Sequence, residues 1–72
     1  MLIYNVFGRH IGVQRKHDRW LVFRADLTER KFSRLYDIAI PDDTTEDEIA
    51  GWLGDIFHEA ATDRHPHVER IE

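Results

Sequence analysis

The chain has 72 residues, a mass of 8.6 kDa and a formal net charge of −4, and this length allows one domain. Its composition, 42% hydrophobic and 33% charged, excludes disorder and fibrous repeats. It has no cysteine and no apolar run longer than four residues, which excludes disulfides, thiolate metal sites and a membrane span. We therefore expect a soluble protein of the cytoplasm.

Four segments within the first forty residues are rich in β-forming residues, and short turns separate them. Gly8 lies in the first turn, His17 and Asp18 form the second, and Pro41 marks the end of the last segment because proline cannot donate to a strand ladder. The pattern predicts an antiparallel meander of four strands, at residues 2–7, 11–16, 19–25 and 32–40.

A helix is predicted after these strands, at residues 46–61. Thr45 and Glu48 have the spacing of a capping box, and acidic residues gather at the start, where the helix dipole favours them. The apolar residues then follow a 3.6-residue period: Ile49, Trp52, Leu53, Ile56, Phe57 and Ala60. We expect one domain at residues 1–62 and a polar tail at residues 63–72, either frayed or a short edge strand.

The predicted fold class is α+β, a ββββα arrangement in which one amphipathic helix packs on one face of the sheet. A helix of sixteen residues is only about 24 Å long and about 10 Å wide, so it covers one face and not the other. Residues 19–25 nevertheless offer apolar side chains to both faces: Trp20 and Val22 to one, Leu21 and Phe23 to the other. One apolar face should therefore remain for a partner.

Small residues along one flank of the predicted helix, Ala50, Gly54 and Ala61, have two interpretations of equal weight. They allow either a close contact with a second helix or close packing on the chain's own sheet, because two glycines cost helix stability that some contact must offset.

Few residues suggest chemistry. The histidine-rich segment with His58, His65 and His67 lacks a metal-binding spacing, and Ser33 lies on a predicted strand and not on an exposed elbow. His10 and His17 flank one strand, an arrangement that is conceivable for RNA cleavage but common for solvated histidines. We expect no enzyme activity, no cofactor and no metal.

The sequence resembles a family of short uncharacterised bacterial proteins in four motifs, over residues 3 to about 60: Asn5–Arg9, Trp20–Phe23, Asp37–Pro41 and Glu46–Glu48. The resemblance implies a bacterial or phage origin and no particular activity.

The sequence predicts a small, non-enzymatic protein-interaction module, homodimeric or bound to another protein, that uses the sheet face left bare by the helix. The predicted binding residues are an aromatic and apolar centre with an arginine rim, which is the usual composition of a binding hot spot: Trp20, Val22, Tyr36, Arg24 and Arg34. The face with Leu21 and Phe23 is the alternative surface, because the sequence does not fix the strand register. Two alternatives are open. A basic sheet could bind nucleic acid, although the acidic second half disfavours this, or an acidic helix could act as an inhibitor or antitoxin-like element.

Overall fold

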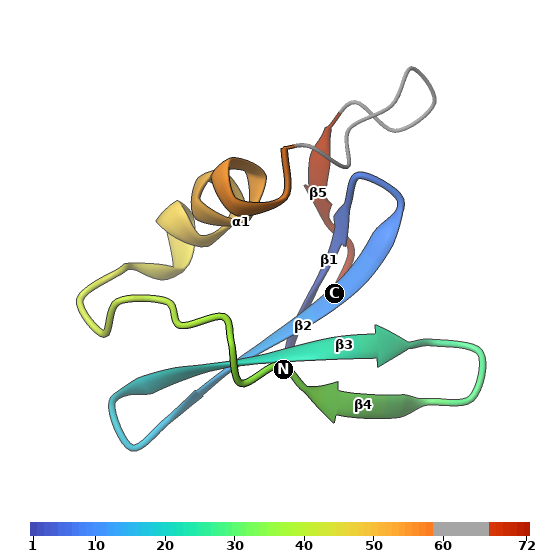
Figure 1. The fold of residues 1–72 in the computed structure, drawn as a ribbon, viewed down its shortest axis with the longest axis horizontal. Helices are drawn as coiled ribbons and strands as arrows, with labels where there is room; N and C mark the ends of the chain where they lie inside the picture. The colour runs from blue at the N-terminus through green and yellow to red at the C-terminus, as the bar shows by residue number, and fades with distance from the viewer. Residues whose placement is uncertain (59–66) are drawn as a thin grey trace.

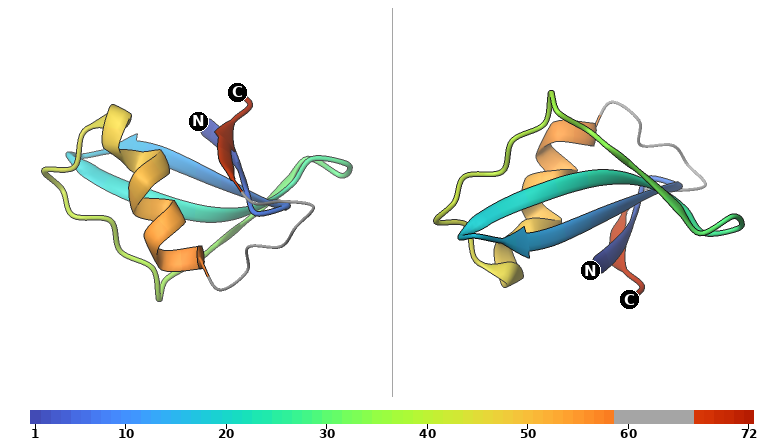
Figure 2. Two further views of the ribbon diagram at one scale, coloured as in Figure 1. Left: turned by 90° about the horizontal axis from the view of Figure 1, so that it is seen from above. Right: turned by 90° about the horizontal axis from the view of Figure 1, so that it is seen from below.

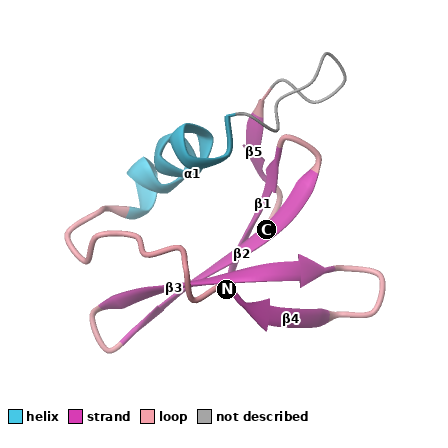
Figure 3. Cartoon of the chain, in the orientation of Figure 1, coloured by secondary structure: helices cyan, strands magenta, loops and turns pink. Residues whose placement is uncertain are grey.

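The structure is a computed structural model that describes residues 1–58 and 67–72 of the chain. The described residues form a twisted antiparallel sheet with one helix beside it (Figures 1 and 3). The elements in chain order are β1 (Leu2–Val6), β2 (Arg9–Lys16), β3 (Arg19–Asp26), β4 (Lys31–Arg34), a 3₁₀ turn (Glu46–Glu48), α1 (Ile49–Phe57) and β5 (Val68–Arg70).

The sheet contains the predicted meander and one more strand. Its order is β4-β3-β2-β1-β5, and every neighbouring pair is antiparallel. The prediction of four strands is therefore wrong by one, because Val68–Arg70 of the predicted tail pair with the outer edge of β1. Three residues of a polar tail carry too weak a pattern to identify an edge strand.

The last predicted strand is also too long. β4 ends at Arg34, and the Leu35 N–H donates the final bond to the Val22 carbonyl at 2.8 Å. The chain then turns at residues 36–37 and leaves the sheet, and Ile40 becomes buried in the core without a strand. Ile38 and Ile40 therefore pack on the core although the segment that contains them is irregular. Their alternation in the sequence is the same as that of a strand, so the pattern alone cannot separate the two cases.

The first two of the three hairpins of the meander have two-residue turns whose backbone has positive φ. The first turn is Phe7–Gly8, with φ of 52° and 89°, and the second is His17–Asp18, with φ of 50° and 61°. Positive φ at both central positions is the signature of the turn that matches the twist of antiparallel strands. The first hairpin consequently closes one residue earlier than the sequence predicted.

The helix begins with the predicted capping residues. The Glu48 carboxylate accepts hydrogen bonds from the Thr45 N–H at 3.0 Å and the Thr45 hydroxyl at 2.8 Å. These two bonds stabilise the charged carboxylate and lower the pKa of Glu48 below its ordinary value. The first turn is 3₁₀ and the α-helix proper ends at Phe57; the remainder of the predicted helix, residues 59–61, lies outside the described residues.

The helix lies across one face of the sheet, in front of β2 and β3 in the left panel of Figure 2. The buried core between them contains Tyr4, Val6, Ile11, Val13, Val22, Ile40, Ile49 and Leu53. Burial of the Tyr4 ring raises the pKa of its phenol. A Cβ built on Gly54 would lie 3.6 Å from a methyl group of Val68, so this small residue faces the chain's own β5 and not a second helix.

Candidate interaction surface

The predicted binding residues Trp20 and Val22 lie on the helix side of the sheet. Val22 is fully buried (0% exposed) and belongs to the core with Ile49 and Leu53, and half-buried Trp20 packs against the same core. Their assignment to the bare face is therefore wrong. Alternation fixes which residues share a face, but it does not say which face the helix takes, because both sets are apolar.

Trp20 connects the sheet to the irregular segment before the helix. Its indole N–H donates to the Thr44 carbonyl at 2.8 Å, and the Arg15 guanidinium lies 4.9 Å from the ring centroid. Arg15 also donates to the Asp42 carbonyl at 2.8 Å. These contacts tie residues 42–44 to β2 and β3, so Trp20 and Arg15 hold the helix on its face.

Arg24 also lies on the helix side, opposite Ile11 on the neighbouring strand, and not on the rim of the bare face. It borders a hollow of about 680 Å³ beside the end of α1, together with Arg9, His10, Asp37 and Phe57. The described residues that line this hollow include no serine, threonine, lysine or tyrosine. The described lining does include His10 and Asp37, but no hydroxyl or amine side chain that such a base could activate.

The opposite side of the sheet is covered by no helix in the described part of the chain (right panel of Figure 2). Strand register places on it a row that crosses neighbouring strands, because Arg34 pairs with Phe23, Phe23 with Gly12, and Gly12 with Ile3. We call this side the uncovered face. Its other large side chains are Met1, Leu21, Phe32 and Ile71, and Tyr36 adjoins it through Arg34.

Four of the five large apolar residues that are most exposed in the described part of the chain lie on or beside the uncovered face; the fifth, Ile56, lies on α1. The exposed fractions are 49% for Met1, 42% for Phe32, 82% for Tyr36 and 43% for Ile71. Half-buried Leu21 and Phe23 lie among them. Contiguous exposed apolar groups with arginine in their midst are typical of a surface that binds another macromolecule.

Gly12 makes a shallow gap at the centre of the uncovered face, and the side chain of Met1 occupies it. A Cβ built on Gly12 would lie 2.7 Å from the Met1 sulfur and 3.4 Å from a methyl group of Ile3. Ile3 is consequently buried although no helix covers it. Methionine is flexible and adapts to irregular gaps, so this part of the face can repack against a partner.

Arg34 and Tyr36 are the two predicted residues that do belong to this surface. The Arg34 guanidinium lies 5.0 Å from the centroid of the Tyr36 ring and 5.9 Å from that of Phe23. The two contacts hold a charged group among exposed aromatic rings at the β4 edge. Phe23 and Phe32 were not among the predicted binding residues, although the alternation of Trp20, Leu21, Val22 and Phe23 contained the necessary signal.

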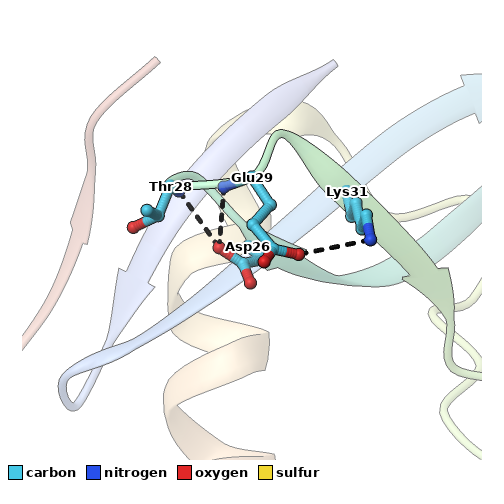
Figure 4. A network of polar contacts seen from close by, with 4 residues as sticks. All are labelled: Asp26, Thr28, Glu29 and Lys31. Carbon is cyan, nitrogen blue, oxygen red and sulfur yellow. Dashed lines mark hydrogen bonds and ion pairs between the residues drawn. The ribbon is translucent and has the colours of Figure 1, made fainter.

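The loop before β4 is closed by its own polar contacts (Figure 4). The Asp26 carboxylate accepts hydrogen bonds from the N–H groups of Thr28 at 3.0 Å and Glu29 at 3.1 Å, and Glu29 pairs with Lys31 at 3.3 Å. An aspartate that accepts from the next residues fixes such a turn. The contacts position β4, and with it Phe32, against β3.

The charges on the uncovered face are divided between its two sides. Lys16, Arg19 and Arg34 lie on it from β2, β3 and β4, and Glu69 lies on it from β5. The N–H groups of Ile71 and Glu72 both donate to the Ile3 carbonyl, which is the pattern of a β-bulge and turns Glu72 toward the same side. The β4 edge of the face therefore carries Arg34 and the β5 edge carries acidic residues, whereas Lys16 and Arg19 lie at the turn between β2 and β3.

The candidate catalytic and metal-binding histidines are not brought together. His10 and His17 lie at opposite ends of β2, roughly 23 Å apart at the rise of an extended strand, so they do not act on one phosphate. Among the described residues there is no group of three or more side chains suited to a metal ion. His65 lies outside the described residues, as do Glu59 and Asp63.

The model of one protein family matches the whole chain, residues 1–72. The chain belongs to the family described as Domain of unknown function (DUF7661). The match extends beyond the resemblance noted over residues 3 to about 60, and a bacterial origin stays a prediction. No curated protein and no solved structure matches the chain. In the described residues, no helix has the length and apolar character needed to cross a bilayer.

Proposed function

We propose that this chain is a small cytoplasmic protein-interaction module, without enzymatic activity, that binds a protein through the uncovered face. The observation that carries the proposal is the set of exposed apolar and aromatic side chains around Arg34, on the side of the sheet opposite α1. A domain of this size buries a small apolar area on folding, so apolar side chains left in a patch on its surface support the presence of a partner.

Two features support binding over catalysis. The described lining of the hollow beside α1 has no serine, threonine, lysine or tyrosine, and His10 and His17 are far apart. The uncovered face, in contrast, has the aromatic and arginine composition of a binding hot spot.

Nucleic acid is a second candidate partner, because Tyr36 is 82% exposed and stacks with Arg34. An exposed ring beside a guanidinium can stack on a base. The acidic β5 edge of the same face opposes a polyanion. A gel-shift series from 50 to about 200 mM salt separates the two: binding to nucleic acid should weaken steeply with salt, and no shift at low salt would exclude it.

The inhibitor alternative depends on the acidic side chains of the helix. Glu48 and Asp55 are exposed, whereas Glu59 lies outside the described residues. A variant with all three changed to lysine should keep its partner if the uncovered face binds it. Loss of the partner in this variant would favour an acidic mimic.

The direct test of the proposed function is site-specific photo-crosslinking in the organism that carries the gene. A photoreactive phenylalanine analogue replaces Phe32 on the uncovered face, and the matched control carries it at exposed Asp55 on α1. We expect a discrete protein adduct from position 32 and none from position 55. Absence of an adduct at position 32, with the variant folded, would overturn the proposal.

A further inference from the structure

We infer that the protein on the uncovered face is a second copy of this chain, in a two-fold dimer whose axis runs parallel to β2. The inference rests on the proposed function and names its partner. In this arrangement β4 of each copy lies over β5 of the other. Three observations lead to it: the position of β2 in the sheet, the charges at the two edges, and the gap at Gly12.

The order of the strands fixes what a two-fold axis would superpose. β2 is the central strand of the order β4-β3-β2-β1-β5. Rotation by 180° about a line parallel to β2, in the plane between two facing sheets, exchanges the two edges. β4 then faces β5 and β3 faces β1, and the facing sheets pack as aligned sheets do, about 10 Å apart.

The charges at the two edges favour this axis over the alternative. The Lys16 residues of the two copies approach each other at one end of β2, where they are exposed and water and salt screen their repulsion. With the axis parallel to β2, the row that contains Arg34 faces its own β5 end in the second copy, where Ile71 and Glu72 lie. Glu69 lies two residues away along β5, opposite Phe32, and is a diagonal neighbour within reach of the long arginine side chain. The same contact occurs twice by symmetry. With the axis perpendicular to the strands, β4 would face β4, and two arginines would meet among desolvated aromatic rings. Like charges in such positions are strongly disfavoured.

The centre of the face suits close approach of two copies. Gly12 lies on the central strand, so the two Gly12 residues face each other near the axis, and the flexible Met1 side chains fill the gap between them. Ile3 and Phe23 flank Gly12 in the same row, and Ile71 continues it at the β5 edge. An apolar centre with a charged rim is the usual anatomy of an interface.

The size of the face sets the expected affinity. Five strands span about 24 Å, and the paired rows average roughly 20 Å, which gives about 500 Å² for each copy. The total of about 1,000 Å² is close to the lower limit for specific interfaces. We therefore expect a dimer that dissociates on dilution within the micromolar range, and analytical ultracentrifugation measures such a constant directly.

The decisive experiment exchanges charges between the two edges. Arg34→Glu alone and Glu69→Lys alone each create two repulsive contacts and should raise the dissociation constant at least about tenfold. An equimolar mixture of the two variants should recover a heterodimer with affinity near that of the unchanged chain, since both of its edge contacts are then between opposite charges. Arg30→Glu and Asp43→Lys are matched controls on exposed loops and should leave dimerisation unchanged.

The outcomes separate this inference from the proposed function. Weakening by both single variants without recovery in the mixture would overturn the arrangement of β4 over β5. A chain that is monomeric up to millimolar concentration would overturn the second copy as partner. In that case a crosslink at position 32 to a protein of different mass would leave the proposed function standing, whereas no crosslink would remove both. Circular dichroism of each variant verifies that it is folded.

Discussion

The two faces of the sheet use the same strands and neighbouring residues, yet they lie in different surroundings. Val22 is fully buried beneath α1, whereas the next residue, Phe23, points to the other side and is half exposed next to Arg34. Likewise Trp20 holds the segment before the helix, while Leu21 lies among exposed apolar side chains. The helix has one apolar stripe, so it can convert only one face into a core.

The comparison shows that apolar character alone does not distinguish a core residue from one on the uncovered face. The covered face is closed by directional contacts, above all the Trp20 bond to Thr44, as well as by burial. On the uncovered face, within the described residues, the side chain of Met1 lies over Gly12 and no helix packs on the apolar side chains. Core substitutions should therefore affect folding, and substitutions on the uncovered face should affect association.

The largest contrast is expected between Leu53→Ala on the covered side and Phe32→Ala on the uncovered face. Leu53 is fully buried, so its truncation should lower the free energy of unfolding by about 3 kcal/mol, whereas Phe32→Ala should change that of the monomer by less than about 1 kcal/mol. Urea denaturation at concentrations below the dimer range measures both. If Leu53→Ala fails to fold, Ile49→Val, with an expected loss of about 1 kcal/mol, replaces it. Equal losses at Leu53 and Phe32 would contradict the distinction between the faces.

A smaller effect is expected from Trp20→Phe. The variant keeps an aromatic ring but loses the hydrogen bond to the Thr44 carbonyl, which leaves a partly buried acceptor unpaired. We expect a loss of about 1–2 kcal/mol by thermal or urea unfolding. Tyr36→Phe is the control, because it removes a hydroxyl from an 82% exposed ring and should change stability by less than about 0.5 kcal/mol. A neutral Trp20→Phe would show that the indole bond does not hold the segment.

Two glycine substitutions, one on the uncovered face and one on the helix, should have different effects on dimerisation and on monomer stability. Gly12→Ala should displace the Met1 side chain, leave monomer stability within about 1 kcal/mol of the original, and weaken dimerisation about fivefold. Gly51→Ala meets no atom within 4 Å and should stabilise the helix by about 1 kcal/mol without affecting dimerisation. Sedimentation and urea unfolding of the same samples check both. Unchanged dimerisation of Gly12→Ala would place the centre of the interface elsewhere.

The smallest expected effect concerns pH and the helix cap. Because the folded-state pKa of Glu48 is lowered, its contribution to stability is present above the ordinary glutamate value and is lost as pH falls through the folded-state pKa. Glu48→Gln should therefore lower stability at pH 7 and flatten its decline between about pH 5 and pH 3. Asp47→Asn, in the same turn, is the control. An unchanged pH profile in Glu48→Gln would show that the Thr45 bonds are absent in solution.

Most of the fold could be predicted from local patterns. The three strands of the first two hairpins, the start of the helix at Thr45 and its buried residues Ile49 and Leu53 all follow from periodicity and capping chemistry. The strand β5 was one of two alternatives for the tail, frayed or a short edge strand, and the sequence could not choose between them because these three residues become a strand only beside the edge of β1. The length of β4 was overestimated because Ile38 and Ile40 pack on the core from an irregular segment and form no strand pairing.

The sequence predicted that one apolar face stays uncovered, but assigned Trp20 and Val22 to it, and the structure places both on the covered side. Alternation along residues 20–23 showed that both faces are apolar, and the width of one helix showed that one of them stays bare. Which face receives the helix depends on the direction in which the chain leaves Leu35 and on the bonds that Arg15 and Trp20 make to residues 42–44. These contacts join residues more than twenty positions apart, and no local pattern specifies them.

The amino-acid sequence by itself thus determined the α+β composition, the hairpins, the capped helix and the existence of a surplus apolar face, because each depends on neighbours within a few residues. The tertiary structure decided which face is covered, brought β5 to the edge of β1, and placed Arg34 and Glu69 at opposite edges of one surface. The physical reason is that a strand alternates its side chains regardless of where the helix docks, so only long-range contacts can choose between its two sides.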